Sequence, residues 1–119
     1  MTTRAHNRWR AWLAAGLAAL TTGLAMAAEV DDLMKQAYEL DRKFQAAQAL
    51  ELYLQVEKQQ PDNAEALTAI ARQYRHLMQD SDSKAEKLRL CELALVYGEK
   101  AAAAAPNDSD AQLSVAITC

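Results

Sequence analysis

The stretch QQPDNAEAL, from Gln59 to Leu67, closes one helical segment and opens another. A proline disfavours helical geometry in the residue before it, and the Asp-Asn pair behind it suits a helix start. The pattern returns in AAPNDSDAQL, so that Pro61 and Pro106 stand 45 residues apart. A chain that repeats this signal predicts a series of helices joined by short turns.

The sequence around these turns predicts helices and no strands. Ala, Leu, Gln, Glu and Lys dominate, and all favour helix. Apolar residues recur at helical spacing within residues 30–40, 44–54, 67–78 and 84–105. The last segment is apolar on two faces, which predicts that helices pack on both sides of it. One face carries Leu88, Cys91 and Leu95, and the other carries Leu90, Ala94, Tyr97 and Ala101.

Polar residues at the turns predict where helices begin. Asp62 with Glu65, Ser83 with Glu86, and Ser109 with Gln112 each have the spacing of a capping box. Gly98 lies within a predicted helix, where glycine costs about 1 kcal/mol relative to alanine. We expect a neighbouring helix to approach closely there.

The N-terminus has the layout of a secretory signal peptide. Three arginines precede an apolar stretch, residues 11–24, and Ala25-Met26-Ala27 supplies a small-x-small cleavage motif. We therefore divide the chain into a signal peptide, residues 1–27, and a mature domain, residues 28–119, and expect export, for example to a bacterial periplasm. The alternative is an uncleaved membrane tether.

Removing residues 1–27 takes away three of the thirteen basic residues and none of the sixteen acidic ones, so the net charge falls from −3 to −6. Such an acidic domain argues against nucleic-acid binding. Export would expose Cys91 and Cys119 to oxidising conditions, where a disulfide can form. With only two cysteines, we favour small apolar side chains at helix contacts over that disulfide.

The helix pairs resemble the tetratricopeptide repeat. Leu67, Ile70-Ala71 and Tyr74 stand at the spacings of its first helix, and Ala49, Tyr53 and Pro61 at those of its second. Leu33 and Ala37 fit the preceding first helix, although a two-residue shift to Tyr38, Phe44 and Ala47 fits about as well. The resemblance implies an all-α fold of antiparallel helix pairs stacked as a short α-solenoid, truncated in the third pair. Its geometry would turn six residues toward a partner-binding groove: Met34, Tyr38, Thr68, Arg72, Arg75 and His76.

A narrower resemblance covers Ala71 onward. The 45-residue unit is longer than the usual 34, and the surplus falls around MQDSDSKAEKLRL. The SD…EK joint, the YGEKA helix and the PNDSDAQLSVAI restart resemble the regulator-of-microtubule-dynamics family and its bacterial relatives. This resemblance implies a helical repeat scaffold, often membrane-tethered or exported, without established chemistry.

The residues do not predict an enzyme or a cofactor. His76 is the one histidine after the signal segment and lacks partners at zinc-site spacing, and no glycine-rich phosphate loop is present. We therefore expect a non-catalytic scaffold or adaptor that binds a protein or peptide. Arg72 and Arg75 would suit an acidic or carboxylate-bearing partner, unless Arg72 pairs with a nearby acid on a solvated face. The alternative is a self-assembling structural unit, in which a second copy covers Leu113, Val115 and Ile117.

Overall fold

The structure, a computed structural model, describes residues 23–116. The chain divides into two compact units, residues 1–31 and 32–119. In the first unit, residues 23–31 are helical, whereas most of the predicted signal peptide lies outside the described residues. Among the helices that are described, none combines the length and the apolar character needed to cross a membrane.

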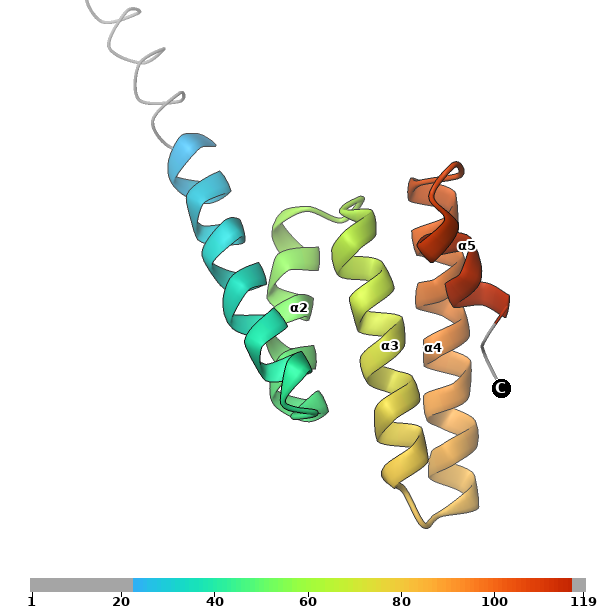
Figure 1. Ribbon diagram of the computed structural model, residues 1–119. Helices are drawn as coiled ribbons and strands as arrows, with labels where there is room; N and C mark the ends of the chain where they lie inside the picture. Colours follow the sequence, from blue (N-terminus) through green and yellow to red (C-terminus); the bar gives the residue numbers. More distant parts are fainter. Residues whose placement is uncertain (1–22, 117–119) are drawn as a thin grey trace, which may run out of the picture. The chain divides into compact units, whose positions relative to one another are not determined.

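The second unit confirms the all-α prediction (Figure 1). Residues 32–42, called here the N-terminal helix, are followed by α2 (Ala46–Gln59), α3 (Ala64–Asp80), α4 (Lys84–Ala104) and α5 (Ser109–Ala116). The described part of the chain contains no strand. Short turns join consecutive helices, so that neighbours run in opposite directions (Figure 1).

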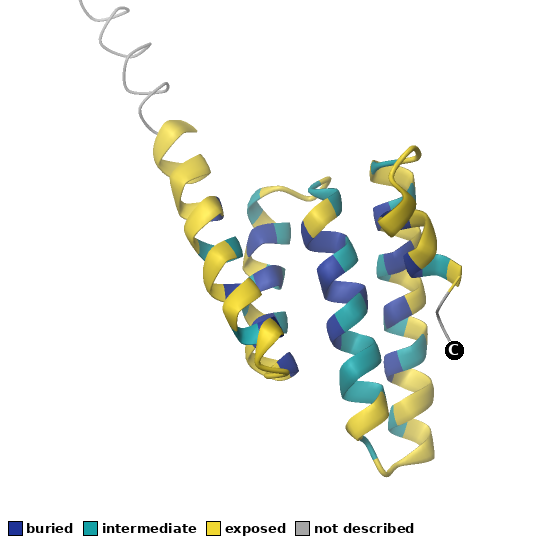
Figure 2. Ribbon diagram, viewed as in Figure 1, coloured by how far each residue is buried: buried dark blue, intermediate teal, exposed yellow. Residues whose placement is uncertain are grey.

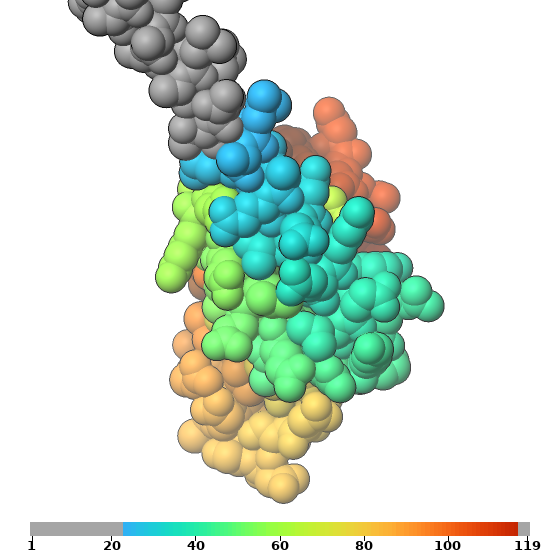
Figure 3. All heavy atoms as spheres, turned by 90° about the vertical axis from the view of Figure 1, so that its left-hand side faces the viewer, coloured from blue at the N-terminus to red at the C-terminus, as the bar shows by residue number. Residues whose placement is uncertain are grey.

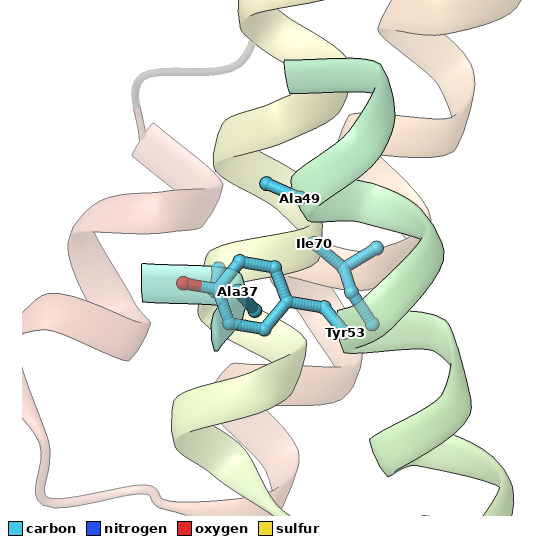
Figure 4. Packing of buried hydrophobic residues seen from close by; sticks show 5 residues of the cluster. Ala37, Ala49, Tyr53 and Ile70 are labelled. Carbon is cyan, nitrogen blue, oxygen red and sulfur yellow. The ribbon is translucent and has the colours of Figure 1, made fainter. Parts of the chain in front are cut away.

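Helix α3 is central, because it contacts α2, α4 and α5. The buried residues of α2, α3 and α4 lie on the faces that these helices turn to one another (Figure 2). One core cluster joins Ala37 of the N-terminal helix to Ala49 and Tyr53 of α2 and to Ile70 of α3 (Figure 4). The small side chains of Ala37 and Ala49, both fully buried, let the helices approach the Tyr53 ring closely.

Burial also distinguishes between the two alignments of the first repeat. Ala37, Ala49 and Tyr53, which belong to the unshifted alignment, are buried. Tyr38 and Phe44, which belong to the shifted one, are exposed. The burial of these residues therefore agrees better with the alignment that begins at Leu33 than with the shifted one.

Two of the predicted helix caps are wrong by one residue. Asn63, not Asp62, caps α3, and its side chain accepts a hydrogen bond from the Ala66 N–H at 3.0 Å. At α5, Asp108 rather than Ser109 accepts from the Asp110 N–H, at 2.9 Å. The Ser83 cap is confirmed, with its hydroxyl accepting from the Glu86 N–H at 3.3 Å. Each stretch offers adjacent capping side chains, and the sequence alone does not rank them.

Gly98 lies where a second helix comes close, as predicted. A Cβ atom at this position would stand 3.1 Å from the backbone oxygen of Ser114 in α5. Backbone atoms cannot rotate away as a side chain can. Gly98 therefore sets how closely α5 packs against α4.

The prediction that α4 is packed on both sides holds for its C-terminal half, which contacts both α3 and α5, but not for its N-terminal half. Leu90, Ala94 and Ala101 are buried, whereas Leu88 and Leu95 are exposed. The α3–α4 turn projects beyond the end of α2, at the bottom of the space-filling view (Figure 3). This projection accounts for the extra length of the 45-residue repeat between Pro61 and Pro106. The first turns of α4 consequently have α3 on one side only.

Cys91 forms a disulfide, which corrects our preference for an unbonded apolar side chain. The sequence has one other cysteine, Cys119, which lies outside the described residues. A count of cysteines says how many pairs are available but not which thiols the fold brings together.

Phe44 was predicted to begin the second helix but lies in the turn before it, with φ of 57°. This left-handed conformation costs a residue with a Cβ about 1–2 kcal/mol. The side chain is 78% exposed, and its ring approaches the His76 ring edge-on, with 6.0 Å between the centroids. Little burial therefore offsets the strain.

We predict that Phe44→Gly stabilises the fold by about 0.5–1 kcal/mol, because relief of the left-handed strain exceeds the entropy that glycine adds to the unfolded chain. Urea unfolding followed by circular dichroism measures the change. Phe44→Ala is the control, since it removes the ring but keeps the Cβ atom. Equal stability of Phe44→Gly and Phe44→Ala would show that the left-handed backbone at this position is not strained.

Candidate functional site

A polar cluster joins the first three helices of the second unit. Asp41 lies near the end of the N-terminal helix, Tyr53 on α2 and Arg72 on α3. Nε of Arg72 donates to Oδ2 of Asp41 at 3.1 Å, and Nη2 of Arg72 donates to the same oxygen. The Tyr53 hydroxyl also donates to Oδ2, at 3.3 Å. Three helices thus meet at a single carboxylate.

This carboxylate is kept charged although it is buried. The Asp41 side chain is 9% exposed and that of Arg72 is 38% exposed. Burial would raise the pKa of the Asp41 carboxyl, but the Arg72 hydrogen bond, with other bonds and the Arg72 charge, lowers it below its ordinary value. Burial, followed by the Asp41 charge, raises the pKa of Tyr53 to about 12. The cluster is therefore an ion pair with a neutral phenol beside it.

A pocket of about 440 Å³ lies directly over this cluster. We call it the groove, and its lining comes from four helical segments and from the turn before α5. The lining residues are Met34, Lys35, Tyr38, Tyr53, Glu65, Thr68, Ala69, Arg72, Asp108 and Asp110. Its surface combines apolar and aromatic side chains with charged ones, which is the composition of a binding site for a side chain or a short segment.

Two cations, Lys35 and Arg72, line the groove, but its net charge is negative. Arg72 is neutralised by Asp41, which leaves the ammonium of Lys35 against the carboxylates of Glu65, Asp108 and Asp110. Within residues 23–116, none of these three carboxylates forms an ion pair. Glu65 and Asp110 lie in the first turns of α3 and α5, whose positive ends stabilise them without neutralising them.

The structure brings together four of the six residues that we predicted for a groove. Met34, Tyr38, Thr68 and Arg72 line it. Arg75 and His76 do not, because they lie further along α3. His76 faces the Phe44 ring, while Nη1 of Arg75 is buried without a hydrogen-bond partner among the described residues. Burial and the nearby Arg72 charge lower the pKa of Arg75.

The alternative that Arg72 pairs with a nearby acid is confirmed, but sequence reasoning did not identify Asp41 as that acid and missed the acidic edge of the groove. Asp108 and Asp110 follow Pro106, 36 or more residues beyond Arg72 in the chain, and reach the groove because α5 packs against α3. One signal for Asp108 and Asp110 was available, because the repeat begins again at Pro106. That restart predicts a third helix pair, whose first helix would lie beside α3. Asp41 was hidden because it sits in a polar run, DRK, without apolar periodicity.

A comparison with protein families identifies the chain. The family model described as Regulator of microtubule dynamics protein 1-3 matches residues 26–119, which is most of the sequence. The chain belongs to this family. Neither the comparison with curated proteins nor that with solved structures gave a match. The resemblance seen from Ala71 onward therefore extends over both helix pairs.

We predict that the fold loses stability as the pH rises from about 10 through 12. Folding raises the pKa of Tyr53 from 10.0 to about 12, so its contribution is complete below the unfolded value and disappears once the native phenol ionises. Urea unfolding at several alkaline pH values measures the loss. Tyr53→Phe should be less stable at neutral pH, but its free energy of unfolding should depend less on pH across this range. An unchanged pH dependence would show that the loss does not come from the Tyr53 phenol.

Proposed function

We propose that this protein is a non-catalytic interaction scaffold that binds a segment of a partner protein in the groove. The observation that carries the proposal is the groove itself, with the partly exposed Arg72 at its floor and the exposed Tyr38 ring at its side. Tyrosine and arginine contribute strongly at protein interfaces because they combine a large contact area with directional hydrogen bonds. The tetratricopeptide-like reading of the helix pairs supports the same proposal, since such repeats expose a concave surface.

Arg72 is held in place before any partner arrives. Its two bonds to Asp41 fix the guanidinium, so binding would cost little additional side-chain entropy. An arginine has five N–H groups, and Nη1 of Arg72 forms no hydrogen bond within residues 23–116. These donors suit the backbone carbonyl groups of an extended segment.

The proposal includes export, which rests on the pattern of residues 1–27. The disulfide at Cys91 supports it, because disulfides persist in oxidising compartments. A bacterial periplasm is the compartment that we favour.

A second candidate function is self-assembly. Leu88 and Leu95 on α4 and Leu113 on α5 are exposed and apolar, and a second copy could cover them. Ile117, which we also predicted for this contact, lies outside the described residues.

We predict that a photo-crosslinking amino acid at position 38 captures one dominant partner in cells. Replacing Tyr38 by azidophenylalanine keeps the ring and the exposure. Thr68→Trp should abolish the crosslink by filling the groove. Glu51→Trp, on the exposed part of α2, should leave it intact.

A crosslink that survives Thr68→Trp would contradict binding in the groove. Crosslinks only between copies of this chain would favour self-assembly. The absence of any crosslinked partner would argue against the scaffold at this surface.

A further inference from the structure

The groove has two electrostatically different parts. The part that we call its floor is lined by Arg72, which has donors to offer but whose charge is neutralised by Asp41. Its edge carries Glu65, Asp108 and Asp110, which outnumber the ammonium of Lys35. A ligand that reaches both parts must bring hydrogen-bond acceptors to the floor and a positive charge to the edge.

We propose that the groove selects a partner segment with a lysine or arginine side chain, whose charged end meets Glu65 and Asp110 while a backbone carbonyl of the same segment accepts from Arg72. This inference rests on the proposed function and adds the chemistry of the partner. It also replaces the acidic partner predicted from Arg72, because that prediction counted a charge which Asp41 neutralises.

The apolar lining supports a long cationic side chain in particular. Met34 and Tyr38 lie one turn apart on the N-terminal helix and border the same groove. Lysine and arginine bury their apolar stems on such surfaces while the charged end stays at a polar edge.

The acidic edge should also repel a partner segment that carries a negative charge. A glutamate or aspartate placed there would meet three carboxylates without an ion-pair partner among the described residues, and like charges at an interface suppress binding. Two helix N-termini weaken this repulsion, since each carries about half a positive charge. The carboxylates still exceed these compensating charges, so the selection should favour cations.

The experiment measures the binding of short peptide pools to the full chain. Each pool carries a neutral fluorophore and is random except at one position, fixed as Lys, Gln or Glu. Fluorescence anisotropy at low salt should give tighter binding for Lys than for Gln and the weakest for Glu. The Lys-to-Glu ratio should be about tenfold and should shrink as salt is added.

Matched variants assign this preference to the groove. Glu65→Gln should reduce the Lys-to-Glu ratio severalfold, whereas Glu92→Gln, which removes an equal charge from an exposed position on α4, should not. An equal effect of both variants would overturn the inference, because the preference would then come from net charge. Thermal unfolding of each variant shows that it is folded.

The remaining outcomes separate this inference from the proposed function. Equal binding of the Lys, Gln and Glu pools, or tighter binding of the Glu pool, would overturn the basic partner while leaving the groove as a binding site. If no pool binds, both the basic partner and the binding of an extended segment are overturned.

Discussion

The ion pair between Arg72 and Asp41 is the interaction on which the second unit depends. A buried carboxylate is costly unless it is paired and hydrogen-bonded, and Oδ2 of Asp41 accepts from both Arg72 and Tyr53. Because these residues come from three helices, the bonds are satisfied only when the N-terminal helix lies against α2 and α3. Hydrophobic contacts within the core cluster around Tyr53 and Ile70 supply much of the attraction, but such contacts have little directional preference. The polar cluster adds direction to this packing.

The same pair shapes the chemistry of the groove. An unpaired arginine at its floor would attract carboxylates, as the sequence first suggests. Because Arg72 is neutralised, the carboxylates at the starts of α3 and α5 determine the net charge of the groove. A residue that stabilises the fold can in this way set the charge that a partner must carry. The position of α5 matters equally, and its close approach to α4 is permitted by Gly98.

Much of the helical layout was predictable from sequence, because proline punctuation and apolar periodicity are local signals. The helices fall where these signals place them, and even the close approach at Gly98 follows from the cost of glycine within a helix. The predictions were wrong where several neighbouring residues could cap the same helix, and they were incomplete where segments distant in the sequence meet. Asn63 competes with Asp62 as a cap, and Phe44 leaves the helix because the turn needs one residue in the left-handed region. Four groove residues were found from repeat geometry, whereas Asp41, Asp108 and Asp110 required the three-dimensional packing.

A double-mutant cycle on Asp41 and Arg72 measures how strongly their ion pair stabilises the packing of the three helices. The free energies of unfolding of Asp41→Ala, Arg72→Ala and the double variant are compared with that of the unmodified chain. We expect a coupling energy of about 1–3 kcal/mol, with the double variant scarcely less stable than the less stable single variant, because each single change leaves a charge without its partner. Additive losses, equal within about 0.5 kcal/mol, would show that the pair does not hold these helices together.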